Sequence, residues 1–272
     1  MKLKLYAFLF LLATALFFIS CEKEDFVDEK EDKNLLKQIL IEGEVYYEYV
    51  YNNAGLILEE KSKYHYSSHK YNTKNHLIRS DHYWDERIFS SSLHVLEEAR
   101  KRTEWISPKN SELDSYINYE YERDGKLKKI TTYRANQGST SYSTYKYNQQ
   151  GRVKQRTSYH KNVPSVLDKF YYDSKGNLVK KERFYVTENS TENLQTTTEY
   201  EFDNKQNPYF SFRKLLTPGK YTNTNNIVKE TYTLHFEVDD FIEKVQVTEY
   251  QYQYNEQGFP VRRNDSFEYV YY

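Results

Sequence analysis

Four of the seven histidines lie close together in the chain: His65, His69, His76 and His82. Imidazole is a common zinc ligand, but a zinc site needs three or four ligands that converge with fixed geometry. Two strands of one hairpin could bring His65 or His69 near His82. The simpler interpretation is that these histidines are scattered along strands among tyrosines, and we expect no metal site.

Catalytic signatures are missing from the sequence. It contains no Gly-x-Ser-x-Gly, P-loop, dinucleotide glycine motif or His-Glu-x-x-His. Its 40 acidic residues could supply a carboxylate pair for glycoside hydrolysis, but they mostly alternate with Lys and Arg, as cross-strand charge pairing would place them. Asp239-Asp240 could suggest a calcium loop, yet it falls at a turn of the repeat described below. We expect no catalytic residue and no cofactor, so the protein is not expected to be an enzyme.

Cys21 is the only cysteine, and it closes an apolar segment. Residues 1–20 combine two lysines near the start with the apolar run Leu5–Ile19, which is shorter than the roughly 20 residues of a transmembrane helix. Phe18-Ile19-Ser20-Cys21 resembles a lipobox, which implies cleavage before Cys21 and acylation of its thiol and amine. Two or more acyl chains anchor a protein stably. The alternative is an uncleaved N-terminal anchor.

Residues 22–33 follow as a densely charged segment in which ten of twelve side chains are charged. Lys23, Glu24 and Asp25 resemble the surface-export signal of Bacteroidota lipoproteins. That resemblance implies an outer-membrane protein, held by its N-terminal lipid and facing the cell exterior. A solvated, disordered spacer is the plainer interpretation of the same residues, and the two are compatible.

The amino-acid composition narrows the possible partners and the type of fold. The chain has 39 basic and 40 acidic residues and a net charge of −1, so nucleic acid is not an expected partner. A single cysteine excludes an internal disulfide. The 30 tyrosines, against 15 Phe and 2 Trp, favour strands with half-buried faces, where each hydroxyl must find water or a partner.

A repeat runs through the chain: two aromatic residues one apart, a polar turn with Gly or Asn, and an apolar residue that opens a charged run. In the copy Tyr145-Lys146-Tyr147 the turn ends at Gly151 and the apolar residue is Val153. Clear copies have their second aromatic residue at Tyr51, Tyr121, Tyr147, Tyr172 and Tyr254, and weaker copies at Tyr71, Phe202, Tyr221 and Phe236.

One unit of this repeat is predicted to be a β-hairpin. Aromatic residues at i and i+2 share one face of a strand. Asn or Asp caps the turn, and Gly adopts the positive φ that closes it. Because one hairpin is marginal alone, neighbours must pair. We therefore predict an all-β fold of repeated antiparallel hairpins in a long twisted meander that curls into a superhelix or an open barrel.

The pattern Tyr-x-Tyr-Asn/Asp-x-x-Gly-x-Leu/Val resembles the tyrosine–aspartate hairpin repeats of the Rhs type. It is closer still to Bacteroidota repeat lipoproteins with domains of unknown function. The resemblance spans roughly Tyr46 to Arg263. It implies a hairpin architecture and no particular activity. Rhs proteins enclose a toxin in many more repeats, so toxin delivery is not expected here.

We expect three segments: a signal peptide at 1–20, a lipidated charged tether at 21–33, and one hairpin-repeat domain at 34–272. Asn34–Ile41 is predicted to be a short helix or a first edge strand. Ser90–Arg102 breaks the pattern and is expected to be a short helix or an insertion. Asn207–Asn226, with two prolines and a glycine, is expected to be irregular.

The leading hypothesis is a surface-exposed lipoprotein with a non-catalytic binding or adhesive role toward a glycan or a protein. The rivals are a structural or assembly protein of the envelope and, less favoured, a glycan-degrading enzyme. The aromatic stripes through Tyr49 and Tyr51 and their equivalents could contact a ligand, although a role in the core is favoured. Trp84 and Trp105, in or beside the irregular segment, are the first candidates for a contact site.

Overall fold

The computed structural model describes residues 35–272 except 90–91, 93, 95–100, 136–137, 188, 215–217 and 236–243. Cys21, Lys23, Glu24 and Asp25 lie outside the described residues. The described elements are seventeen strands and three short 3₁₀ helices: β1 Leu36–Ile41, β2 Glu44–Tyr51, β3 Ile57–Lys61, β4 His65–Tyr71, β5 Leu77–Trp84, η1 Glu86–Phe89, β6 Ser115–Tyr121, β7 Leu127–Arg134, β8 Gly138–Tyr147, β9 Val153–His160, β10 Val163–Tyr172, β11 Leu178–Val186, β12 Glu192–Gln206, η2 Phe210–Lys214, η3 Lys220–Thr222, β13 Asn225–Leu234, β14 Val245–Glu249, β15 Tyr252–Tyr254, β16 Pro260–Arg263 and β17 Phe267–Tyr271.

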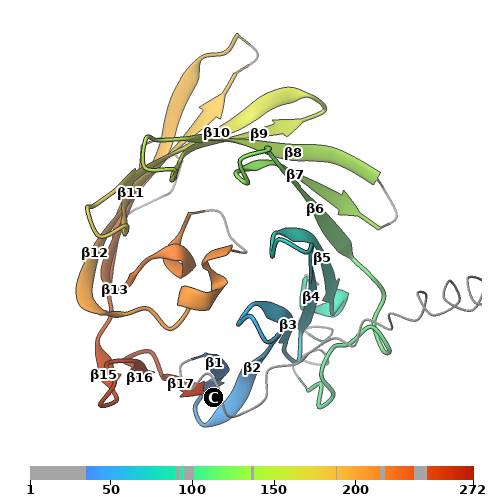
Figure 1. The fold of residues 1–272 in the computed structure, drawn as a ribbon, viewed down its shortest axis with the longest axis vertical. Coiled ribbons are helices and arrows are strands. Elements are labelled where there is room, and N and C mark those ends of the chain that lie inside the picture. Colours follow the sequence, from blue (N-terminus) through green and yellow to red (C-terminus); the bar gives the residue numbers. More distant parts are fainter. Residues whose placement is uncertain are drawn as a thin grey trace, which may run out of the picture.

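The strands form one antiparallel meander that curls into a ring (Figure 1). Consecutive strands pair with each other from β1 to β14 and from β15 to β17, and β1 also pairs with β17, so the two ends of the sheet meet. No ladder joins β14 to β15 among the described residues, and the sheet is open at that step. The predicted hairpin meander is confirmed, and its curl corresponds to the open-barrel alternative.

Six copies of the repeat form the same turn, as the β8–β9 hairpin illustrates. The Asn148 N–H donates to the Arg152 carbonyl over 2.9 Å, and the Gly151 N–H donates to the Asn148 carbonyl over 3.1 Å. Asn148 Oδ1 accepts a bond from the Arg152 N–H at 2.9 Å, as predicted for a capping asparagine. Gly151 has φ 76°, a conformation that favours glycine. The same pair of backbone bonds closes the turns that begin at Asn52, Asn72, Glu122, Asp173 and Asn255.

The weak copies at Phe202 and Tyr221 are two halves of one hairpin. In the clear copies the second aromatic residue lies opposite the apolar residue, as Tyr147 lies opposite Val153. Phe202 on β12 lies opposite Ile227 on β13 in the same way. Between them the short turn is replaced by residues 207–224, which carry η2 and η3. The prediction of a separate turn at each copy is therefore wrong, because one turn has been expanded into an insertion.

In five copies of the repeat, the second tyrosine ties its hairpin to an earlier part of the sheet. Tyr121 OH, for example, donates to the Leu77 carbonyl at the start of β5 over 2.8 Å. A buried hydroxyl needs such a partner, and the bond also satisfies a carbonyl beside a register shift. The same bond joins Tyr51 to Leu36, Tyr71 to Ile57, Tyr147 to Leu127 and Tyr172 to Val153, over 2.7–2.9 Å. Tyr252, the first tyrosine of its copy, and Tyr271 donate in the same way to the Ile227 and Pro260 carbonyls, over 3.0 and 2.7 Å.

The insertion enters the ring and supplies part of the core (Figure 1). Phe212 of η2 is 4% exposed, and its ring lies 4.8 Å from Tyr49 and 5.4 Å from Tyr209. Buried asparagines hold the insertion to the sheet: Asn223 Oδ1 accepts from the Leu178 N–H at 2.7 Å. The buried apolar cluster is Leu35, Leu36, Ile39, Tyr49, Tyr51, Ile57, Leu77, Phe212 and Tyr269.

The first described segment is a strand with two partners. Strand β1 is hydrogen-bonded to β17 on one side and to β2 on the other. The helix alternative for Asn34–Ile41 is wrong, and the strand is not an edge, because the curl of the sheet brings β17 beside it. Most of Ser90–Arg102 and the repeat copy at Phe236 lie outside the described residues. The predicted irregular segment Asn207–Asn226 is an insertion with two 3₁₀ helices over 207–224, whereas Asn225 and Asn226 already belong to β13.

Candidate functional site

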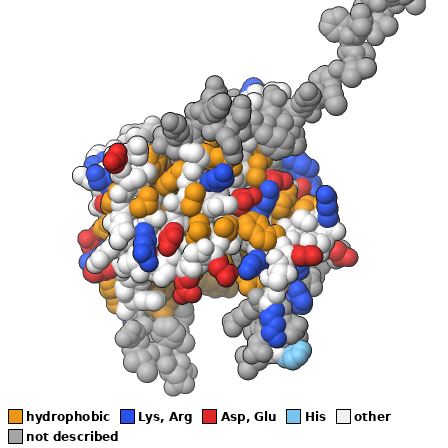
Figure 2. Space-filling model, turned by 90° about the horizontal axis from the view of Figure 1, so that it is seen from below, with side chains coloured by type: hydrophobic (Ala, Val, Ile, Leu, Met, Phe, Trp, Pro, Cys, Tyr) orange, Lys and Arg blue, Asp and Glu red, His pale blue; other side chains and the backbone are white. Residues whose placement is uncertain are grey.

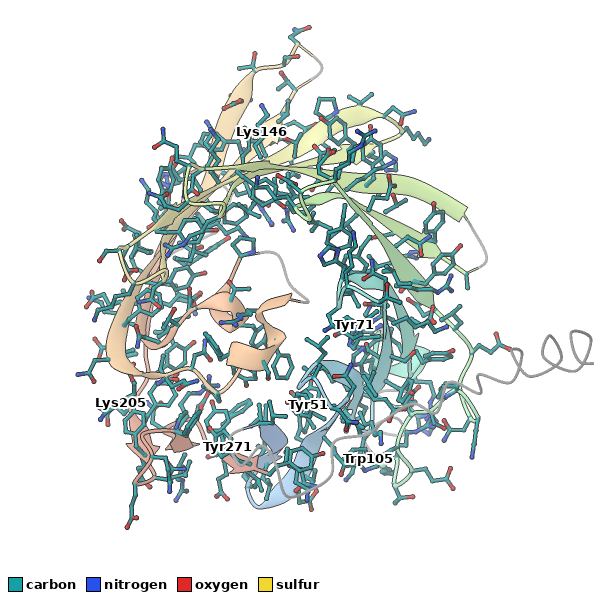
Figure 3. The ribbon with its side chains drawn as sticks, in the orientation of Figure 1. Tyr51, Tyr71, Trp105, Lys146, Lys205 and Tyr271 are labelled. Carbon is teal, nitrogen blue, oxygen red and sulfur yellow. The ribbon has the colours of Figure 1, made fainter. Side chains whose placement is uncertain are left out.

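The cross-strand register assigns each strand residue to the inner or the outer face of the ring. Residues directly opposite each other share a face. Tyr49 packs on Phe212 inside the ring, which makes its register partners inward-facing too. Figure 3 shows Tyr51 and Tyr71 on this inner side. The aromatic stripes of the repeat therefore face inward, and Tyr49, Tyr51 and Phe170 are at most 4% exposed, as the core interpretation expects.

A second set of aromatic rings lies on the outer face, in cross-strand pairs. The rings of Tyr116 and Tyr133 stack with centroids 4.7 Å apart, and those of Tyr142 and Tyr159 stack at 4.6 Å. The first pair joins β6 to β7 and the second joins β8 to β9. We call the outer tyrosine row the six residues Tyr66, Tyr83, Tyr116, Tyr133, Tyr142 and Tyr159.

Cationic side chains lie over the rings of this outer face. The Arg79 guanidinium is 3.9 Å from the Tyr116 ring centroid, and Lys129 Nζ is 4.5 Å from that of Tyr142. Such cation–π contacts hold the rings and cations in fixed positions. The row is half-buried except for Tyr66, which is 7% exposed and donates to Glu59.

A regular spacing in the sequence could have identified this row. Tyr116 and Tyr142 each precede the first aromatic residue of their repeat copy by three positions, so they lie on the opposite face of the strand. Tyr133 and Tyr159 each follow the apolar residue of their copy by six positions. A bulge beside each turn adds one residue to one strand and so changes which residues of the two strands share a face. Without the position of this bulge, the sequence alone could not show that these tyrosines form one row.

Trp84 lines a cleft beside the β5–β6 connection. The cleft has a volume of about 430 Å³ and is lined by both acids and arginines. Within it, Asp85 accepts bonds from Arg87 at 2.7 and 2.9 Å and lies 3.4 Å from Arg102. The hydrogen bonds from Arg87 hold the pKa of Asp85 below its ordinary value.

The two tryptophans differ in their surroundings. The Trp84 ring lies 4.2 Å from that of His65. The Trp105 carbonyl accepts a bond from Asn110 Nδ2 at 3.0 Å, and Trp105 is half-buried but not among the residues that line the Trp84 cleft (labelled in Figure 3). The structure therefore places only Trp84 in the cleft, and a ligand role for either residue stays a prediction.

Three of the four clustered histidines lie on the inner face. Ser67 Oγ is 2.7 Å from His65 Nε2 and 2.6 Å from His82 Nδ1, and His65 Nδ1 is 3.2 Å from Glu60. This order of acid, base and hydroxyl could activate a nucleophile, but Ser67 is 2% exposed and bonded on both sides. No group of three or more potential metal ligands converges within the described part of the chain.

His69 and His82 are held in surroundings that disfavour their charged forms. Burial, with the neighbouring imidazoles, lowers the pKa of His69 to about 3. Burial likewise lowers the pKa of His82. His69 Nδ1 is hydrogen-bonded to Ser80 Oγ at 2.8 Å, and Ser80 Oγ lies 3.2 Å from Tyr119 OH. His76 lies apart, with its ring 4.6 Å from that of Tyr121.

The outer surface mixes apolar and charged side chains (Figure 2). Cross-strand ion pairs recur on it, such as Lys229 with Glu201 at 2.8 Å and Lys61 with Glu48 at 3.7 Å. Across the described ranges, helices are too short or too polar to span a membrane.

Comparisons with known proteins give distant structural likenesses only. No protein-family model matches the chain, and no curated protein matches it. A porin-like protein from Bacteroides uniformis is 10% identical, with 87% of this chain and 98% of that chain covered and a TM-score of 0.39. One from Bacteroides vulgatus is 13% identical, with 88% and 99% covered and a TM-score of 0.39. The TcdB2-TccC3 structure is 13% identical over 84% of this chain and 10% of that chain, with a TM-score of 0.30. Likenesses at this level assign the chain to no family and give it no function.

Proposed function

We propose that this protein is a lipid-anchored protein of the outer membrane that faces the cell exterior and acts as a non-catalytic binding or adhesion module. The location is supported by Cys21 and by the charged residues Lys23, Glu24 and Asp25. The ion pairs on the outer face suit a surface in contact with water. Protease added to intact cells should cut the protein; protection until the cells are lysed would place it inside the envelope instead.

The outer tyrosine row carries the binding proposal. Tyr and Arg are enriched at protein contact surfaces, because the phenol ring and the guanidinium group are large and lose little conformational freedom on binding. Tyrosine rings also stack on sugars through their apolar faces. The cations above Tyr116 and Tyr142 fix the rings before a ligand arrives, which lowers the entropy cost of binding. The ligand is a glycan or a protein.

The test is a glycan array together with capture of envelope and host-surface proteins by the purified mature chain. Tyr133→Ala and Tyr159→Ala should each weaken binding at least about tenfold, as loss of a central contact does. Tyr171→Ala is the matched control, because Tyr171 is 41% exposed and lies on the same outer face but outside the row. Unchanged binding by both row variants would remove the outer tyrosine row as the contact surface.

The Trp84 cleft is the second candidate contact. Its combination of an indole ring with Arg87, Arg102 and Arg134 could hold a ligand that is part apolar and part anionic. A loss of binding on Trp84→Ala, with Tyr133→Ala unaffected, would move the site there. A loss on Trp105→Ala alone would place it on the connection beside the cleft.

A further inference from the structure

A cluster of charged residues crosses the inner face of β9, β10 and β11, on the face opposite to the outer tyrosine row. Asp168 on β10 lies directly opposite Arg156 on β9 and Arg183 on β11. Arg156 in turn lies opposite Tyr145, which is the first aromatic residue of its repeat copy and faces inward. Lys181, two residues before Arg183, shares this face.

Asp168 is already fully satisfied by its neighbours. The carboxylate is 0% exposed, and Oδ2 accepts bonds from Nε and Nη2 of Arg156, the former at 2.9 Å. Oδ1 accepts a bond from Arg183 Nε at 2.9 Å, and Lys181 Nζ lies 3.8 Å from it. Burial by itself would raise the pKa of Asp168. The hydrogen bond from Arg183 and the charge of Arg156 outweigh burial and hold this pKa below its ordinary value. One carboxylate thus faces three cations.

Two of these cations, Arg183 and Lys181, can still bind a further anionic group. Arg183 donates to Asp168 through Nε only, its Nη1 and Nη2 make no hydrogen bond to any described residue, and its side chain is 42% exposed. Lys181 is 25% exposed and approaches the carboxylate no closer than 3.8 Å. Glu230 is the second acid whose charge acts on Lys181, so three cations face two acids and the cluster keeps a positive excess. A guanidinium end with two free nitrogens matches the two oxygens of a carboxylate or sulfate.

Hydroxyl groups surround the cluster on the same face. Ser143 and Ser158, one cross-strand row away, are hydrogen-bonded to each other at 3.0 Å. Thr196 lies opposite Arg183 on β12, and the nearby Ser141 is exposed. Tyr145 OH makes no hydrogen bond to a described residue. These hydroxyl groups can exchange hydrogen bonds with the hydroxyls of a sugar. An inorganic anion has no hydroxyl groups that would require them.

We infer that the inner face of β8–β12 binds an acidic saccharide, whose carboxylate or sulfate group is received by the free nitrogens of Arg183 and by Lys181. The site is separate from the outer tyrosine row. It goes beyond the proposed function by adding a second binding face with its own ligand class, and it does not depend on the row. Variants of the row should leave this binding unchanged, so failure of one proposal does not imply failure of the other.

The test is calorimetric titration of the mature chain with an oligogalacturonate, a sulfated dextran oligomer, a neutral dextran oligomer and inorganic sulfate. We expect one or both acidic oligomers to bind, and the neutral oligomer and sulfate alone to bind at least tenfold more weakly. Whichever acidic oligomer binds identifies the anionic group. Arg183→Gln and Lys181→Gln should each reduce that affinity about tenfold. Lys229→Gln on the outer face removes the same charge and should have no effect.

Each of the following outcomes would overturn the inference: equal binding of the neutral oligomer, an unchanged affinity in both inner-face variants, or an equal loss in Lys229→Gln, which would indicate net charge only. Inorganic sulfate that binds as well as the oligomers would also overturn the saccharide assignment. Arg183→Gln leaves both Arg156 bonds to Asp168 in place, and Lys181→Gln removes only a 3.8 Å contact. Circular dichroism of both variants checks that the fold is intact.

Discussion

At the scale of the residue, tyrosine is used in three different ways on one sheet. The inward first tyrosine of a copy fills the core, as Tyr49 does. The second tyrosine donates to a carbonyl of an earlier hairpin, as Tyr121 does to Leu77. The outward tyrosines pair with one another, as Tyr116 and Tyr133 do. The abundance of tyrosine predicted a strand-rich fold with satisfied hydroxyls, but the role of each ring depended on the face and register of its strand.

His69 provides a prediction at this scale. Its pKa of about 3 in the folded chain lies below the ordinary value of 6.5. Between these values the unfolded chain binds a proton that the folded chain excludes. Stability should therefore fall as the pH drops from 6.5 toward 3, by up to about 1.4 kcal/mol per pH unit for this group, and be unaffected above 6.5.

The measurement is the free energy of unfolding by urea between pH 7.5 and 4, for the natural chain and for His69→Gln. Glutamine keeps a donor for Ser80 but cannot titrate, so the variant should lose less stability on acidification. Parallel curves for the two proteins would contradict the buried, neutral state of His69.

At the scale of the element, one hairpin design is repeated and once expanded. The turn bonds, the capping Asn or Asp and the pairing of the second aromatic with the apolar residue recur from copy to copy. The β12–β13 copy keeps the pairing of Phe202 with Ile227 but replaces the turn with residues 207–224. The sequence pattern identified both halves of this copy. The pattern could not show that the two halves pair with each other, because the insertion separates them in the sequence.

Two turn glycines provide a prediction at this scale. Gly151 has φ 76° and open space around an added Cβ, whereas a Cβ on Gly176, at φ 97°, would lie 2.9 Å from Arg152 Nη2. Gly151→Ala should cost about 1 kcal/mol from backbone strain alone. Gly176→Ala should cost more, because Arg152 must move and release its 3.1 Å bond to the Asp173 carbonyl.

Thermal and urea unfolding of both variants gives the comparison. Gly151→Asn is the matched control, since Asn75 adopts φ 58° at the same turn position of the β4–β5 hairpin. It should be milder than Gly151→Ala. Equal costs for the two alanine variants would show that the contact with Arg152 does not matter.

At the scale of the whole molecule, the ring depends on a seam between the two ends of the described chain. Strand β17 pairs with β1 from Phe267 to Tyr271. Tyr272 adds two bonds, from its N–H to the Leu35 carbonyl and from its hydroxyl to the Tyr49 carbonyl. Tyr269 on β17 is 4% exposed in the core. Without this seam, β1 would have a free edge and the core would lose one wall.

Removal of residues 267–272 tests the seam. The shortened chain should lose cooperative unfolding and bind a hydrophobic dye, because core residues around Tyr49 and Phe212 become accessible. Val270→Ala is the control on the same strand, since Val270 is 36% exposed and should cost little. A sharp melting transition in the truncated protein, with no dye binding, would show that the ring does not need its seam.

The sequence by itself determined the strands, the hairpin turns and the all-β meander, because these follow from local alternation and from turn chemistry within about ten residues. It also placed Cys21 and its charged neighbours, which await a test. Only the tertiary structure decided that β1 meets β17, that residues 207–224 fill the ring, and which aromatic rings face outward. It alone brought Asp168, Arg156 and Arg183 together. These arrangements arise from register and curl accumulated over many strands, and no single segment of the sequence encodes them.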